Sequence, residues 1–324
     1  MLNVFVFQDL LVNAVKARDV TGVTVALQKG ADPNTTCSWK CSWPQATNTG
    51  DTVLYYAVVQ QDTAVVKALL REENINIDKC DDDRPTALYN AIVNSNYAIA
   101  ELLLLKGANP DRSSGHDCNT PLRAAIMKGN KQMVALLLQH KASVDLASGH
   151  YGRPPLFEAM LRAWKQLGIC QLLLQHNANP DAKDGYGRPT LAVAAKLGYL
   201  GICRLLLQHN ANPNGIRGYN SIYIAARNCR RDVIELIMEY HGDPQLPLDG
   251  SSHAAADVAR AYGHNDLANW LCKQRKLTYR DAEDVGPSGT YRNESGLVFF
   301  HISSILENLS MISFILTILY QLEK

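Results

Sequence analysis

The residues of this chain that could bind a metal or react covalently include eight cysteines and nine histidines. Cys37 and Cys41 lie closest together, but three residues separate them instead of two, and no second close pair exists. Cys170 and Cys203 each follow an isoleucine in the same register of a repeated apolar segment, which is typical of small buried side chains. The spacing therefore predicts no metal site, and eight cysteines in this length are too few for a disulfide scaffold.

Sequence motifs of catalysis are absent from the chain. It has no Gly-rich phosphate loop ending in Gly-Lys-Ser/Thr, no Gly-x-Ser-x-Gly, no His-Glu-x-x-His and no Cys-x-x-Cys. Gly185-Tyr186-Gly187 has the look of a nucleotide-binding loop, but we expect these glycines to serve a turn between repeated units. We therefore predict a protein that is not an enzyme, with no cofactor and no small-molecule substrate.

The cysteines and histidines lie in a chain that is built from repeated segments, which are predicted to be helical. Leu172–Asp181 returns almost letter for letter as Leu205–Asn214, and four weaker copies occur elsewhere. In the six copies the turn after the apolar run falls at Gly30, Gly107, Lys141, Asn177, Asn210 and His241. The last five are spaced by 34, 36, 33 and 31 residues, close to the ~33 residues of an ankyrin repeat. The chain therefore resembles the ankyrin-repeat family over residues 1 to about 278.

The family's Thr-Pro-Leu-x-x-Ala box is clearest at Thr120–Ala125 and is partial at Thr52–Ala57 and Thr86–Ala91. Threonine is expected to cap the first helix of each unit, and glycine nine residues later to end it. The resemblance implies an all-α solenoid of about eight helix-turn-helix repeats joined by short β-hairpin loops. Its first and last repeats are expected to act as caps.

Composition agrees with a long folded solenoid and limits the kind of partner. The 324 residues are 47% hydrophobic and 19% charged, so the chain has enough apolar surface to fold. A net charge of +1 gives no overall field for a polyanion, and we predict no nucleic-acid partner. The low cysteine density fits a reducing compartment, which favours a cytoplasmic location.

Aromatic residues in the loops are the candidate partner-binding residues. Trp39 and Trp43 lie in a loop between Asn34 and Thr52 that is about ten residues longer than its counterparts. Matching the units to the family also puts His116, Tyr151, Tyr186 and Tyr219 near successive hairpin tips. A row of aromatics on rigid turns would suit protein binding. The alternative is that each side chain packs only on its own loop or hairpin.

The C-terminal part has a different composition. Residues 279–296 have no periodicity and are predicted to be a linker. Residues 297–324 are predicted to form a hydrophobic, amphipathic helix, because Leu297–Tyr320 holds fourteen Leu, Ile, Val or Phe residues and one polar stripe. It is long enough to cross a membrane, but Glu307 near its middle opposes insertion. A membrane anchor, a docked helix and an unstructured tail remain alternatives.

The resemblance implies that the chain binds another protein, as a cytoplasmic scaffold or adaptor. A second hypothesis is a membrane-tethered protein of the same family, anchored by Leu297–Tyr320. A third is a substrate receptor of a ubiquitin ligase, which in this family carries a C-terminal SOCS box, although no recognisable box of that kind is present. Fold alone does not distinguish these functions.

Overall fold

The structure is a computed structural model that describes residues 2–37, 51–80, 85–113, 119–216, 218–246, 254–274, 291–292 and 298–299. Helix makes up most of its regular structure, which confirms the predicted helical repeat fold. The helices are α1 (Leu2–Lys16), α2 (Val20–Gln28), α3 (Val53–Val59), α4 (Thr63–Leu69), α5 (Ala87–Val93), α6 (Tyr97–Leu105), α7 (Pro121–Lys128), α8 (Lys131–Gln139), α9 (Pro155–Met160), α10 (Ala163–Gln175), α11 (Thr190–Leu197), α12 (Leu200–Gln208), α13 (Ser221–Arg227), α14 (Arg231–Glu239), α15 (Ala255–Ala261) and α16 (Asn265–Gln274).

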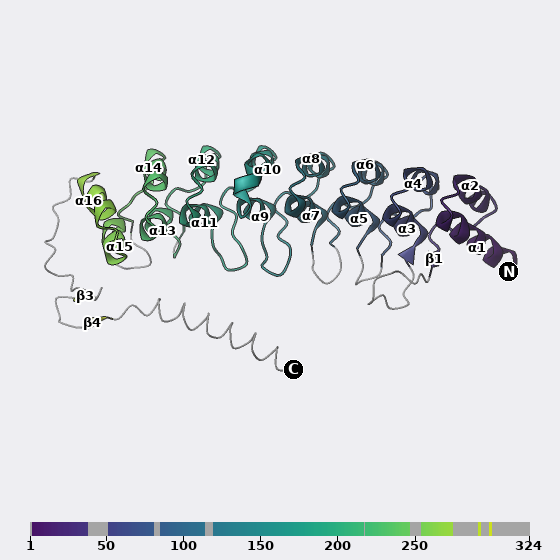
Figure 1. The fold of residues 1–324 in the computed structure, drawn as a ribbon, viewed down its shortest axis with the longest axis horizontal. Helices are drawn as coiled ribbons and strands as arrows, with labels where there is room; N and C mark the ends of the chain where they lie inside the picture. Colours follow the sequence, from purple (N-terminus) through teal and green to yellow (C-terminus); the bar gives the residue numbers. More distant parts are fainter. Residues whose placement is uncertain are drawn as a thin grey trace.

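The helices are arranged in two rows. Figure 1 shows the odd-numbered helices in the lower row, from which the long loops extend, and the even-numbered helices in the row above it. Each helix contacts its partner in the same pair, and most helices also contact the helix of their own row in the next pair, as α5 contacts α6 and α7. Contacts between neighbouring units only are the defining property of a solenoid.

Three odd-numbered helices, α3, α5 and α7, begin at the predicted threonine caps. The hydroxyl oxygens of Thr52, Thr86 and Thr120 each accept a hydrogen bond from the backbone N–H three residues later. Each bond satisfies one of the N–H groups that the first turn of a helix leaves without a partner. Pro154 and Pro189 take the cap position in the next two units without such a bond, so the box departs there without losing the helix.

Left-handed residues end the helices at the predicted positions. Gly30, Gly107, Lys141, Asn177, Asn210 and His241 all have φ between 63° and 91° after the second helix of their units. Gly129, Gly198 and Gly263 have the same conformation after the first helix, as do Gln61, Ser95 and Cys229, where the sequence lacks the glycine. The turn geometry therefore persists at these non-glycine positions, each of which bears the strain of a positive φ.

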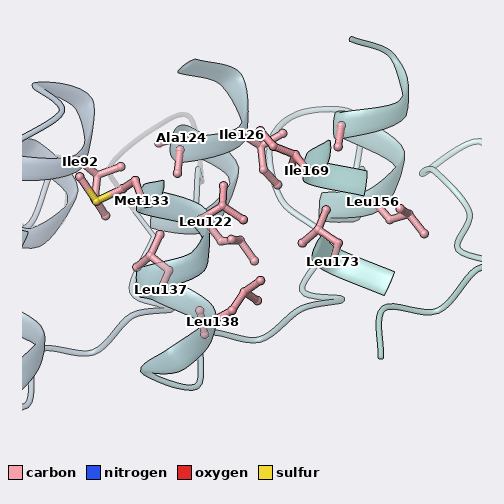
Figure 2. Packing of buried hydrophobic residues seen from close by; sticks show 14 of the residues in the cluster. Ile92, Leu122, Ala124, Ile126, Met133, Leu137, Leu138, Leu156, Ile169 and Leu173 are labelled. Atoms are coloured by element: carbon pink, nitrogen blue, oxygen red, sulfur yellow. The ribbon is translucent and has the colours of Figure 1, made fainter. Parts of the chain in front are cut away.

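The core is a continuous layer between the two rows. Figure 2 shows apolar side chains of α7, α8, α9 and α10 packed together, among them Leu122, Leu137, Leu156 and Leu173. Each fully buried leucine contributes about 2 kcal/mol through its removal from water. The units thus share one core instead of dividing into globular domains.

Cys170 and Cys203 occupy equivalent buried positions in α10 and α12, as the sequence predicted. Burial raises the pKa of both thiols to about 12. Both thiols therefore stay protonated at neutral pH and behave as small apolar side chains.

A ladder of hydrogen bonds joins successive units beside the hairpins. In each rung an Asp or Asn side chain accepts from a backbone N–H of the following unit, over 2.6 to 3.0 Å. The accepting residues are Asn34, Asp78, Asp111, Asp145, Asp181 and Asn214. The Asp or Asn that closes the repeated turn segment, as Asp181 closes Asn179-Pro180-Asp181, thus links successive units.

The pair α9–α10 absorbs two extra residues. The turn at Asn177 follows that at Lys141 by 36 residues, two more than the 34 between Gly107 and Lys141. Helix α10 begins at Ala163 and is 13 residues long, against nine for α8 and α12. The extra residues therefore lengthen the second helix. The side chain of Trp164 lies outside the described part of the structure.

Two short antiparallel sheets lie outside the helical rows. Strand β1 (Thr36–Cys37) pairs with β2 (Asp51–Thr52), and so brings together the two ends of the long loop. Strand β3 (Tyr291–Arg292) pairs with β4 (Val298–Phe299). Val298 and Phe299 are therefore strand residues, where the sequence predicted a helix from Leu297, and residues 300–324 lie outside the described residues.

Candidate functional site

The structure describes three of the six predicted partner-binding residues. Tyr151, Tyr186 and Tyr219 lie in the hairpins that precede α9, α11 and α13. Trp39, Trp43 and His116 fall outside the described residues. The candidate site is therefore built from the three tyrosines and their surroundings.

Tyr151 and Tyr186 come together although 35 positions separate them in the sequence. Their ring centroids are 6.3 Å apart and the ring planes are tilted by 40°, a separation within the range of interacting aromatic rings. The residues are 48% and 63% exposed. Two large aromatic side chains therefore share one accessible surface.

The backbones of the two hairpins are fitted directly to each other. The N–H of Gly185 donates to the carbonyl oxygen of Tyr151 over 2.9 Å. A Cβ at position 185 would lie only 2.7 Å from that oxygen, so a larger residue could not keep this contact. The rings are therefore presented by two hairpins that hold each other in place.

An arginine covers each of these tyrosines, which the sequence reasoning missed. The guanidinium of Arg153 lies 4.5 Å from the centre of the Tyr151 ring, and that of Arg188 lies 5.1 Å from the Tyr186 ring. Both are within the range of cation–π attraction. The available signal was the repeated Tyr-Gly-Arg-Pro sequence, at 151–154 and 186–189. We call Tyr151, Arg153, Tyr186 and Arg188 the Tyr–Arg tip.

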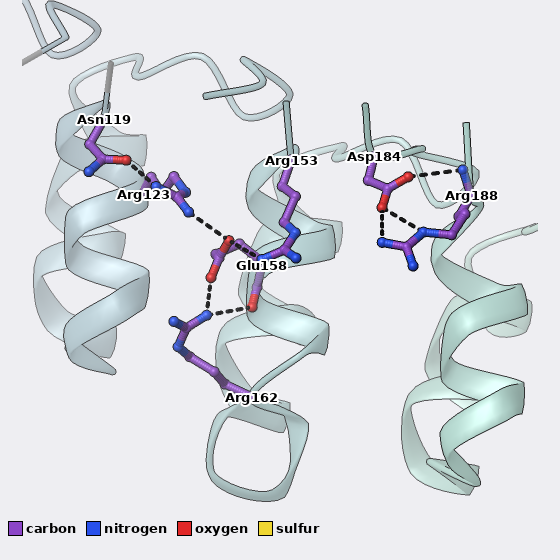
Figure 3. Close-up of polar contacts among 7 residues, drawn as sticks. All are labelled: Asn119, Arg123, Arg153, Glu158, Arg162, Asp184 and Arg188. Atoms are coloured by element: carbon purple, nitrogen blue, oxygen red, sulfur yellow. Dashed lines mark hydrogen bonds and ion pairs between the residues drawn. The ribbon is translucent and has the colours of Figure 1, made fainter. Parts of the chain in front are cut away.

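Asp184 fixes the second half of the Tyr–Arg tip. Its buried carboxylate accepts from the backbone N–H groups of Tyr186 and Arg188, and from Nε of Arg188 over 2.8 Å. Figure 3 shows the guanidinium of Arg188 turned toward this carboxylate. One buried aspartate thus determines both the turn and the direction of the arginine.

Glu158 stands in the corresponding place beneath the first half. It lies on α9, is almost completely buried, and accepts hydrogen bonds from Arg123 of α7, at 3.1 Å, and from Arg162. Arg153 approaches the same carboxylate at 3.7 Å (Figure 3). The three guanidinium groups satisfy a carboxylate that would otherwise be costly to bury.

The pKa of Glu158 reflects this balance. Burial by itself raises the pKa, but the positive charges of Arg123 and Arg162, with their hydrogen bonds, outweigh it and hold the pKa below its ordinary value. Glu158 therefore remains charged at neutral pH.

Tyr219 is placed differently from the other two tyrosines. It is half-buried, and its backbone N–H donates to the carbonyl oxygen of Ile216 over 2.8 Å. A Cβ at Gly215 would fall 2.1 Å from the carbonyl oxygen of Tyr219, which shows how closely the hairpin folds on itself. Tyr219 is therefore held within its own turn, next to Asn220, the cap of α13.

The described residues contain no group of three or more His, Cys, Asp or Glu that could hold a metal ion. In the same part of the chain no helix is long and apolar enough to cross a membrane. The Tyr–Arg tip presents aromatic rings and permanently charged guanidiniums.

Comparisons with known proteins agree with the geometry. A family model for three copies of the ankyrin repeat matches residues 11–114, 106–184 and 163–247. The ankyrin repeat domain of Bcl-3, a unique member of the IkappaB protein family, is similar with a TM-score of 0.59 and 24% identity, over 68% of this chain and 98% of that chain. The human ASB11 ankyrin repeat domain is similar with a TM-score of 0.53 and 23% identity, over 68% and 97%. No curated protein sequence matches the chain.

Proposed function

Because the chain belongs to the ankyrin-repeat family, we propose that it is a non-enzymatic scaffold or adaptor that binds a protein partner through its hairpin tips and the adjoining concave face. Ankyrin repeats are protein–protein interaction modules and are generally without enzymatic activity. The observation that carries the proposal is the exposed pair of Tyr151 and Tyr186 on hairpins fixed by hydrogen bonds.

The physical properties of this pair suit a binding surface. Tyrosine and arginine are over-represented among the residues that dominate binding energy at protein interfaces. The Tyr–Arg tip offers two of each, and buried carboxylates hold both arginines in place before any partner arrives. Little side-chain freedom therefore remains to be lost on binding.

A quantitative pull-down from cells that express the protein would test this proposal. The baits are the full chain, its Tyr151→Ala/Tyr186→Ala double variant, and Tyr97→Ala as the control. Tyr97 is 41% exposed on α6, in the other row of helices. The double variant should capture at least about tenfold less partner than the wild-type chain, whereas Tyr97→Ala should capture the same amount as wild type. Equal capture by all three baits would refute a role for these hairpins.

The cytoplasm is the location that we propose for this module. In the described part of the chain, Cys80, Cys170, Cys203, Cys229 and Cys272 are free thiols. Free thiols at buried and exposed positions alike support a reducing compartment.

A membrane-tethered protein is the second candidate function. Fourteen of the 24 residues of Leu297–Tyr320 are Leu, Ile, Val or Phe. As a helix, 24 residues are long enough to cross a hydrocarbon layer of about 30 Å. If this segment is an anchor, the full chain should resist alkaline extraction from membranes. Glu307→Leu should then strengthen retention, because it removes the central charge. A protein that alkali releases completely would rule the anchor out.

A further inference from the structure

We propose that the Tyr–Arg tip selects an acidic segment of the partner protein, with Arg153 and Arg188 as the residues that determine this preference. The inference rests on the proposed function, and adds the chemistry of the partner. It follows from where the positive and negative charges of this region lie.

The carboxylates of the region are buried, whereas three of its four guanidiniums are partly exposed. The side chains of Glu158 and Asp184 are 1% and 0% exposed, whereas those of Arg153, Arg162 and Arg188 are 20%, 34% and 38% exposed. With the nearly buried Arg123, four guanidiniums accompany two carboxylates. This network by itself therefore carries two net positive charges, although most of its groups are paired.

Other charges in the two hairpins do not reverse this sign. Lys183 is exposed and adds a further positive charge. Asp145 and Asp181 begin the hairpins and keep their negative charges while they accept hydrogen bonds from the backbone N–H groups of Asn179 and Asn212. With Lys183 and these two carboxylates included, five positive and four negative charges leave a net charge of +1 in the region. The accessible field at the Tyr–Arg tip is thus positive even though the whole chain carries a net charge of only +1.

The geometry also favours carboxylates combined with apolar side chains. A guanidinium stacked on a tyrosine keeps N–H groups at its edge, and these match the two oxygens of a carboxylate. The adjacent pair of rings, 6.3 Å apart, offers an aromatic surface for a hydrophobic side chain. A segment in which Asp or Glu residues flank a hydrophobic residue satisfies both requirements.

Selection from a random-peptide library displayed on phage, with the full chain as the target, would test the inference. The selected peptides should be enriched in Asp and Glu, and their affinity should fall as salt is raised, because exposed charge pairs are screened. A selection with no acidic enrichment would overturn the inference.

Variants locate the preference within the protein. For the best acidic peptide, measured by fluorescence anisotropy, Arg153→Gln should weaken binding about five- to tenfold. Arg188→Lys should weaken it less, because lysine keeps the charge but not the flat fork of donors. Arg204→Gln, an exposed arginine on α12, is the matched control and should change nothing. Equal affinity of Arg153→Gln and wild type would exclude Arg153 from this role.

Two further outcomes separate this inference from the proposed function. Peptides that are neutral or basic, yet lose affinity for Tyr151→Ala/Tyr186→Ala, would refute the acidic preference and leave the binding surface in place. Peptides that bind this double variant with the same affinity as wild type would refute both the acidic preference and the proposed binding surface. A peptide that binds more tightly when phosphoserine replaces its Glu residues would overturn the assignment to carboxylates.

Discussion

The hairpin that carries Tyr186 and the hairpin that carries Tyr219 follow one another along the same row of loops, yet they present tyrosine differently. Tyr186 stands three residues before Pro189, the cap of α11, and is 63% exposed. Tyr219 stands one residue before Asn220, the cap of α13, and is half-buried. In this register Tyr219 corresponds to Arg188, not to Tyr186. Position relative to the helix cap therefore determines how far a hairpin tyrosine is exposed.

The largest effect is expected when the carboxylate of Glu158, beneath Tyr151, is removed. Glu158→Ala should lower the free energy of unfolding by about 3 kcal/mol or more, because it leaves the nearly buried guanidinium of Arg123 without its ion-pair partner. Denaturant unfolding measures the loss. Glu235→Ala is the control, since Glu235 pairs with Arg231 on the surface and should cost less than about 1 kcal/mol. Similar losses in the two variants would mean that the Glu158 network is no stronger than a surface pair.

A smaller effect is expected where the two hairpins touch. Gly185→Ala should destabilise by about 1 to 2 kcal/mol, because the added methyl group meets the carbonyl oxygen of Tyr151. It should also weaken peptide binding by separating the rings. Gly201→Ala within α12 is the control, since its nearest neighbour atom is 4.0 Å away, and alanine there should be neutral or mildly stabilising. Unchanged unfolding and binding in Gly185→Ala would show that the hairpins adapt freely.

Smaller still is the expected difference between the two tyrosines themselves. Tyr186→Ala should change stability by less than about 0.5 kcal/mol but reduce partner binding. Tyr219→Ala should cost about 1 kcal/mol, through lost packing within its turn, and leave binding unchanged. Thermal unfolding and pull-down on the same preparations measure both quantities. A loss of binding in Tyr219→Ala would return this residue to the contact surface.

The smallest change should be a difference in acid sensitivity. Glu158 has a lowered pKa in the folded protein, so its stabilisation is complete above the unfolded value, near 4.5, and is lost as the pH falls through the folded pKa. Glu158→Gln should therefore lose less stability than wild type over this acidic range, as measured by urea unfolding at successive pH values. An identical decline in both proteins would assign the acid sensitivity to other carboxylates.

Local features of the fold could be predicted from the sequence because each depends on a few adjacent residues. The caps at Thr86 and Thr120 and the left-handed turns at Asn177 and Asn210 are examples, and all are confirmed. Such features repeat with the unit, so one clear copy identifies the weaker ones.

The candidate site could be predicted only in part, because it depends on contacts between units. The sequence singled out Tyr151 and Tyr186, but pairing them requires knowing that Gly185 meets the backbone of Tyr151. The network around Glu158 joins α7 to α9. The i,i+4 spacing of Glu158 and Arg162 indicates one of its ion pairs, but nothing within a single unit reveals the partner Arg123 on α7. Tyr219 was grouped with the others by residue type, without its position relative to the helix cap.

The ladder of Asp and Asn side chains has a consequence for how such a chain can change its length. Each rung joins a side chain of one unit to a backbone N–H of the next, so the donor does not depend on the residue type at its position. Excision of residues 146–181 would place Asp145 before the same N–H of Asn212 that Asp181 now binds. A whole unit can thus be lost or copied without leaving a rung unmade. The near identity of Leu172–Asp181 and Leu205–Asn214 is what recent copying of such a unit would produce.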